Sequence, residues 1–278
     1  MAATAWRATL RECLGRIHRE ARITVTRIPR PDIWAFVVGC YNSGTELLAE
    51  ILSSHPEIAA LPTEGHFLTD QFPTDFELGL PRMWVLREDL FRLTERDEGP
   101  DPDRIKKEWG MRLDRSRPIF LEKSPPNTAR TRWLQRHFSN AHFIAIVRNG
   151  YAVAEGIHRK AEPKHRRKGW PLGLCARQWA RSNRVLLDDA AYLERIHWVR
   201  YEELTREPQS GVDEILRFLG LSPEGRGIDV SGAWAVHERN GPIRNLNPES
   251  LARLTPEDLQ AVNREAEPML RHFGYEVL

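Results

Sequence analysis

Residues 39–46 combine residue types that could bind an anion. They read Gly-Cys-Tyr-Asn-Ser-Gly-Thr-Glu and lie between an apolar run, 33–38, and a segment with helical periodicity, 46–53. Glycines allow a tight turn, so that the N–H groups of the loop and of the first helical turn converge on one point. The helix dipole adds about half a positive charge there. We expect these residues to contact the anion: Cys40, Tyr41, Asn42, Ser43, Gly44, Thr45 and Glu46.

Arg148 is a second candidate for anion binding. It directly follows the apolar run 141–147, which predicts a buried strand. The carboxyl end of a strand is where open α/β sheets place their ligands, and a planar guanidinium suits phosphate oxygens. A surface salt bridge is the alternative role for this side chain. A ligand with two separated phosphoryl-type anions would use both sites.

The elements that must position these residues alternate along the chain. Buried strands are predicted at 33–38, 118–121, 141–147 and 197–201. Helices are predicted at 46–53, 133–138, 174–193 and 211–219. Strands that alternate with helices predict an α/β fold with a central parallel sheet covered by helices on both faces.

The first 30 residues have a different pattern. Apolar side chains spaced by three or four residues form one helical face: Trp6, Leu10, Leu14, Ile17 and Ala21. We expect residues 1–30 to form an amphipathic helix that packs on the rest of the chain or on a partner copy, which would give an oligomer. Residues 31–278 are expected to form a single domain.

The composition of the chain limits the class of protein. The chain has 278 residues and a formal net charge of +2, which gives no argument for nucleic-acid binding. It has no run of 18 apolar residues, so no membrane span is expected. The widely spaced Cys13, Cys40 and Cys175 indicate reduced thiols and a cytoplasmic location. Basic residues at 164–168 could guide an anionic partner or form a solvated loop.

The loop differs from the P-loop of nucleoside-triphosphate enzymes at one position. That motif requires Lys-Ser or Lys-Thr after its second glycine, to bind the β- and γ-phosphates and magnesium. Here Thr45 and Glu46 follow Gly44, so a carboxylate stands where the cation is needed. The sequence therefore disfavours a P-loop kinase, which stays an alternative.

With its neighbouring blocks, the loop resembles the family of sulfotransferases that use 3′-phosphoadenosine 5′-phosphosulfate (PAPS). Further blocks match in order, among them Glu-Lys-Ser-Pro and the strand that ends in Val-Arg-Asn-Gly. The resemblance implies a P-loop-like sulfotransferase fold and sulfuryl transfer from PAPS to an acceptor hydroxyl, on a carbohydrate, a tyrosyl group or another natural product. The blocks that match are 39–48, 54–58, 122–127, 143–150, 199–204 and 218–221.

The resemblance also implies roles for single residues. Glu64 is expected to be the catalytic base, with His66 as the second candidate, and Lys123 is expected to stabilise the leaving group. An exposed loop glutamate and a surface lysine are the alternative readings. The histidines have no metal-ligand spacing, and no metal is expected. PAPS contacts are expected from Arg148 at the 3′-phosphate, Tyr201 near the adenine, and Arg244 and Asn247 in a C-terminal lid.

Three positions depart from the family pattern. Asn42 stands where the family has Arg or Lys, and Glu46 stands where it has a hydroxyl residue. Gly156 stands eight residues after Arg148, where the family has a Ser that helps to hold the 3′-phosphate. A relative that binds PAPS, or the desulfated nucleotide PAP, but is catalytically impaired is therefore an alternative function.

Overall fold

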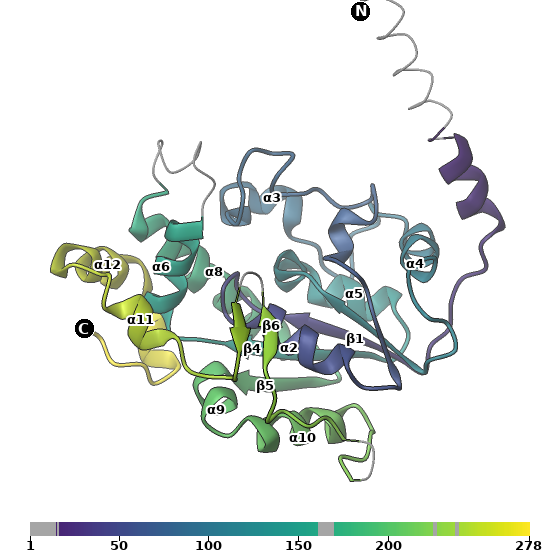
Figure 1. The fold of residues 1–278 in the computed structure, drawn as a ribbon. Coiled ribbons are helices and arrows are strands. Elements are labelled where there is room, and N and C mark those ends of the chain that lie inside the picture. The colour runs from purple at the N-terminus through teal and green to yellow at the C-terminus, as the bar shows by residue number, and fades with distance from the viewer. Residues whose placement is uncertain (1–14, 16, 161–169, 225–226, 237–238) are drawn as a thin grey trace, which may run out of the picture.

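The computed structural model describes residues 15, 17–160, 170–224, 227–236 and 239–278 (Figure 1). A five-stranded parallel sheet has the strand order β2-β3-β1-β4-β5. Its strands are β1 (Ile33–Val38), β2 (Ile58–Ala60), β3 (Ile119–Lys123), β4 (Ala141–Val147) and β5 (Ile196–Arg200). The predicted α/β fold with a central parallel sheet is confirmed.

Helices connect these strands and follow them. The α-helices are α2 (Thr45–Ser53), α3 (Glu88–Phe91), α4 (Pro102–Gly110), α5 (Thr131–His137), α6 (Gly150–Lys160), α8 (Leu172–Ala190), α9 (Tyr201–Arg206), α10 (Pro208–Phe218), α11 (Asn247–Leu251) and α12 (Pro256–His272). The described residues also form the 3₁₀ helices η1 (Gly65–Phe67), η2 (Trp84–Arg87) and η3 (Pro125–Arg130). A short antiparallel hairpin pairs β6 (Trp234–Val236) with β7 (Arg239–Gly241).

Apolar side chains on alternate positions of β1 bury both faces of the sheet. Ala35 and Val37 belong to a cluster with residues of α2, α9 and α10. Trp34 and Phe36 point to the opposite face and join aromatic residues of α4 and α5. Figure 1 shows α9 and α10 on one side of the sheet and α4 and α5 on the other. A strand buried on both faces must be apolar throughout, which is why the apolar run 33–38 predicted this strand correctly.

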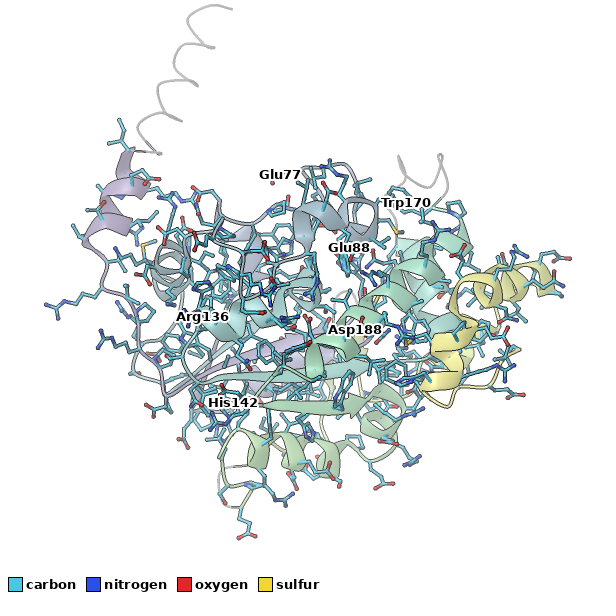
Figure 2. All side chains as sticks on the ribbon, turned by 180° about the vertical axis from the view of Figure 1, so that it is seen from behind. Glu77, Glu88, Arg136, His142, Trp170 and Asp188 are labelled. Atoms are coloured by element: carbon cyan, nitrogen blue, oxygen red, sulfur yellow. The ribbon has the colours of Figure 1, made fainter. Side chains whose placement is uncertain are left out.

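The carboxyl ends of β1, β3 and β4 lie side by side, because these strands are parallel and adjacent. A bundle of α6, α8, α11 and α12 lies at one end of the molecule (Figure 1). In Figure 2, His142 near the beginning of β4 and Trp170 just before α8 lie on opposite sides of the molecule. Because the carboxyl ends of β1, β3 and β4 are adjacent, the loops that follow these three strands meet at the same end of the sheet.

The N-terminal segment is helical over residues 17–25. Ile23 is buried, and Arg19 and Glu20 form ion pairs of 2.7 Å with Glu108 and Arg104 of α4. This segment contacts the rest of the chain through Ile23 and these ion pairs, whereas Ile17 and Ala21 of the predicted apolar face are exposed. Its predicted residues 1–14 and the basic cluster at 164–168 lie outside the described residues.

Candidate active site

The loop after β1 has the backbone shape that the glycine pattern predicted. Gly39 has a φ of +150°, and a Cβ there would lie 2.4 Å from the carbonyl oxygen of Ile146. Gly44 has a φ of +103° and precedes Thr45, the first residue of α2. The chain therefore turns tightly from the end of β1 into the N-terminus of α2. The first N–H groups of a helix have no partner within the helix, so this turn presents them toward an anion.

Polar atoms of the loop side chains are left without partners. The Ser43 hydroxyl and both amide atoms of Asn42 are buried and form no hydrogen bond to any described residue. Buried polar groups are nearly always hydrogen-bonded, so such atoms indicate a ligand or water site. A phosphate-type oxyanion fits this loop, because hydroxyl, amide and backbone N–H groups can all donate to it.

Two side chains of the loop point elsewhere. The Cys40 thiol is buried, and burial raises its pKa to about 12, so it stays protonated. Tyr41 donates a hydrogen bond of 3.0 Å to Asp75 Oδ2. Cys40 and Tyr41 can therefore contact a ligand in the loop only through their backbone N–H groups.

Arg148 lies at the carboxyl end of β4, beside this loop. Its Nη1 donates to the Asn42 carbonyl oxygen at 2.9 Å, and its Nε donates to Asn247 Oδ1 at 2.7 Å. The guanidinium lies 4.2 Å from the centre of the Tyr201 ring, and Arg148 as a whole is 8% exposed. Burial lowers the pKa of Arg148, although the nearby Tyr201 and Glu202 favour its charged form. The structure thus brings Arg148, Asn42, Tyr201 and Asn247 together.

The segment before α11 is fixed to Tyr201, whose ring lies against Arg148. The Tyr201 hydroxyl donates to the Arg244 carbonyl oxygen and accepts from the Leu246 N–H, both at 3.2 Å. The Arg244 side chain points away, since it is 62% exposed and its guanidinium pairs with Glu249 at 2.9 Å. Of the two lid residues expected from the sequence, the structure places only Asn247 against Arg148.

Glu202 is a residue of this region that sequence reasoning missed. Its Oε1 accepts from the Asn149 N–H at 2.9 Å and from Asn247 Nδ2 at 2.7 Å, and its Oε2 accepts from the Tyr275 hydroxyl at 2.9 Å. The carboxylate therefore joins the end of β4 to two C-terminal segments. The signal in the sequence was that Glu202 directly follows Tyr201 within the matching block 199–204.

Lys123, at the end of β3, lies between two carboxylates. Its Nζ donates to Glu64 Oε1 at 2.9 Å and forms a second, shorter ion pair with Glu46 Oε2. Burial lowers the pKa of Lys123, but the two carboxylates outweigh that effect and raise it above its usual value. Burial raises the pKa of Glu64, and the Lys123 ammonium opposes the rise. The predicted base and the predicted cation are thus in direct contact.

The backbone around Glu64 is held by buried groups. The Gly65 N–H donates to Glu122 Oε1 at 2.9 Å, and the Trp109 indole N–H donates to the Gly65 carbonyl oxygen at 3.0 Å. A Cβ at Gly65 would lie 2.8 Å from both the Glu122 carboxylate and the Trp109 ring. The residue after the predicted base must therefore be glycine for these contacts to form.

His66 is placed less well for proton transfer. Its Nδ1 lies 3.2 Å from the Ser124 hydroxyl and 3.6 Å from Glu64 Oε2, and the ring is buried. Burial, with the nearby cations Arg130 and Lys123, lowers the pKa of His66 to about 3. A neutral, weakly basic imidazole favours Glu64 over His66 as the base.

Arg130 and Asp75 form a buried polar group that sequence reasoning also missed. Arg130 is fully buried, stacks 4.0 Å from the centre of the Phe72 ring, and has three guanidinium nitrogens without a hydrogen bond to any described residue. Burial lowers its pKa to about 10, and Glu122, Tyr41 and Asp75 act as counter-charges. These residues are far apart in sequence, so no local pattern could have grouped them.

The site and the sheet together define the class of the protein. A phosphate-type loop at the end of β1, with a buried arginine at the end of adjacent β4, is the arrangement of a phosphate-binding α/β protein. The sequence profile of the sulfotransferase family matches residues 35–224, more than half of the chain. The chain therefore belongs to the sulfotransferase family.

Curated relatives and solved structures agree with this family. The chain is 23% identical to protein-tyrosine sulfotransferase 2 of Gallus gallus, over 87% of this chain and 69% of the relative. It is 22% identical to protein-tyrosine sulfotransferase A of Caenorhabditis elegans, over 89% of this chain and 68% of the relative.

The fold is shared with a solved sulfotransferase domain of the Synechococcus PCC 7002 olefin synthase. That match has a TM-score of 0.54 and 22% identity, and it covers 90% of this chain and 97% of that domain. The sulfotransferase domain from the curacin biosynthetic pathway matches with a TM-score of 0.53 and 20% identity, over 90% of this chain and 100% of that domain.

Two further features concern the described part of the chain only. No helix there has the length and apolar character needed to cross a membrane. No group of three or more His, Cys, Asp or Glu side chains there is arranged to hold a metal ion.

Proposed function

We propose that this protein transfers a sulfuryl group from PAPS to the hydroxyl of an acceptor. The observation that carries the proposal is the contact between the loop and Arg148, whose Nη1 donates to the Asn42 carbonyl oxygen at 2.9 Å. It joins two anion-binding elements into one site. PAPS carries a 5′-phosphosulfate and a separate 3′-phosphate, so it needs two such elements. Family membership supports the same donor.

The loop residues and Arg148, which follows β4, bind different parts of the donor. The N–H groups of the loop and of the first turn of α2, with the Ser43 hydroxyl, bind the 5′-phosphosulfate end. Arg148 binds the 3′-phosphate through its free Nη2, which makes no hydrogen bond within the described chain. Asn247 and Glu202 keep the guanidinium in place. The Tyr201 ring packs against the guanidinium, and the Tyr201 hydroxyl fixes the segment before Asn247.

Glu64 and Lys123 act on the transferred group. Glu64 accepts the proton of the acceptor hydroxyl while the oxygen of that hydroxyl forms a bond to the sulfur of PAPS. The bond between sulfur and the bridging oxygen breaks, and PAP leaves with the electron pair. Lys123 neutralises the negative charge that develops on the leaving phosphate. Positioning and charge stabilisation are the main contributions of the protein in a transfer of this kind.

Glu46 is expected to weaken donor binding. It lies in the first turn of α2, and its 43% exposed carboxylate shares Lys123 with Glu64. A carboxylate beside a bound phosphosulfate repels it and competes with it for the ammonium. We predict that Glu46→Gln binds PAP about threefold to tenfold more tightly in calorimetry, as expected for the loss of one partly screened repulsion. Weaker binding by this variant would mean that Glu46 is needed to hold Lys123 in place.

The class of acceptor is proposed from the names of the relatives. The two curated relatives are named as protein-tyrosine sulfotransferases, which favours a tyrosyl hydroxyl, and carbohydrate or other natural-product hydroxyls form the alternative class. The cytoplasmic location is proposed from the wide spacing of the cysteines in the sequence. The family match removes most of the support for a P-loop kinase.

The test is a donor-consumption assay with radiolabelled PAPS. Tyrosyl peptides, oligosaccharides and small phenols are offered in turn, and transfer of label to any acceptor supports the proposal. Calorimetry with PAP is run in parallel. Binding of PAP without transfer to any acceptor would favour the impaired, donor-binding relative. Absence of PAP binding would contradict the proposed function.

A further inference from the structure

The Asn42 side chain is the least explained polar group of the loop. Asn42 has a φ of +62°, and its Oδ1 and Nδ2 are buried with no hydrogen bond to a described residue. A buried amide without partners costs roughly 1–3 kcal/mol. Both of its functional atoms are therefore expected to have partners in the state in which the protein works.

Gly156 explains how this side chain fits. A Cβ at Gly156 would lie 3.2 Å from both Cβ and Cγ of Asn42 and 3.6 Å from its Nδ2. Gly156 lies within α6 and is buried. A glycine inside a helix costs about 0.5–1 kcal/mol relative to alanine, so its presence needs a steric reason. The Asn42 side chain occupies the space that a side chain at 156 would take.

Arg148 places this amide beside the expected 3′-phosphate. Its Nη1 donates to the carbonyl oxygen of Asn42 itself, at 2.9 Å. The backbone and the side chain of one loop residue thus connect Arg148 with Gly156. Asn42 and Gly156, two of the three positions that depart from the family pattern, are thus neighbours, because the Asn42 side chain fills the space beside Gly156.

We infer that Asn42 Nδ2 donates a hydrogen bond to the 3′-phosphate of the donor nucleotide, in place of a side chain from position 156. The two amide atoms match the ligand. A phosphate oxygen accepts from Nδ2, and the neighbouring ribose 2′-hydroxyl can donate to Oδ1. The inference rests on the proposed function, since it assigns a residue to the 3′-phosphate subsite of that donor. Asn42 thereby contributes to nucleotide selection rather than to stabilisation of the sulfuryl group.

The test compares two nucleotides that differ only in the 3′-phosphate. Calorimetry measures the Kd of PAP and of adenosine 5′-phosphate for the wild type and for Asn42→Gly, a change that keeps the positive φ and removes the amide. We expect about tenfold weaker PAP binding, as for one hydrogen bond to a charged group, and a change below about twofold for adenosine 5′-phosphate.

Asn140→Gly is the matched control. Asn140 also has a positive φ, of 54°, but its Nδ2 donates to the Asp32 carbonyl oxygen, at the opposite edge of the sheet. This variant is expected to bind both nucleotides like the wild type. Thermal unfolding of all variants confirms that they are folded at the temperature of the titration.

A second pair of variants tests the coupling to position 156. Gly156→Ser alone is expected to weaken PAP binding, because its Cβ crowds Asn42. Asn42→Gly combined with Gly156→Ser is expected to regain most of the PAP affinity, because the space is free and the serine hydroxyl can donate instead.

The outcomes separate the inference from the proposed function. If the wild type binds PAP and Asn42→Gly binds it equally well, or loses both nucleotides equally, the inference is overturned while the donor assignment stands. If the wild type binds PAP no more tightly than adenosine 5′-phosphate, the subsite and the donor assignment are both wrong.

Discussion

Glu64→Gln is expected to reduce kcat by roughly 10²–10⁴-fold, the usual contribution of a general base. Glutamine keeps the shape of the side chain but cannot accept the proton of the acceptor hydroxyl. The Kd of PAP should not rise, because Glu64 lies beside Lys123 and outside the loop proposed to bind the donor, so that the substitution removes no donor contact. Steady-state transfer assays and calorimetry measure the two quantities.

The pH dependence of the wild type gives an independent readout. Burial raises the pKa of Glu64, with the Lys123 ammonium opposing the rise. A base must be ionised to act, so kcat/KM should increase with pH through this raised pKa and fall below it. Removing the ammonium by Lys123→Met should move the rise to higher pH. Glu64→Gln should lose this limb of the profile.

Glu50→Gln serves as the control for this change. Glu50 is exposed on α2 and should tolerate the same substitution with unchanged kcat. A Glu64→Gln variant that keeps the wild-type rate and pH profile would exclude Glu64 as the base. His66 is too weakly basic to replace Glu64, because burial lowers the pKa of His66 to about 3.

Lys123→Met is expected to reduce kcat by roughly 10²–10³-fold, the typical effect of removing one group that stabilises developing charge. Methionine keeps most of the volume and removes the ammonium, so charge on the departing PAP is no longer neutralised. The change also leaves Glu46 and Glu64 without their shared cation. We therefore expect a lower thermal stability, and the kinetics must be measured well below the unfolding temperature.

Two further variants separate chemistry from stability. Lys123→Met with Glu46→Gln removes the charge of one of the two carboxylates that lose Lys123, and should regain stability but not kcat. Lys107→Met, on α4 away from the loop, should leave both quantities near those of the wild type. If Lys123→Met retained full turnover, the role of Lys123 in leaving-group stabilisation would be wrong.

The sequence predicted the central strands because their burial makes their pattern unambiguous. The apolar runs 33–38 and 141–147 coincide with β1 and β4, which lie in the middle of the sheet and are covered on both faces. Strand β2 was missed, because three residues at the sheet edge carry too little pattern. The hairpin of β6 and β7 is equally short.

The site was predictable only where residues follow elements directly. The loop after β1, Lys123 at the end of β3 and Arg148 after β4 are brought to one edge by a parallel sheet, as expected. Side-chain directions were not predictable: Tyr41 turns to Asp75, and Arg244 turns outward to Glu249. Contacts between residues far apart in the chain, such as those of Asn42 with Gly156, depend on tertiary packing and leave no local signal.

The two hydrogen bonds that fix Gly65 have a consequence for acceptor binding. They hold the peptide next to Glu64 through Glu122 on one side and Trp109 on the other, both fully buried. The conformational entropy of this peptide is thus lost when the chain folds and not when the acceptor arrives. The proposed base is therefore preorganised, and the free energy of acceptor binding can be used for orientation of the hydroxyl.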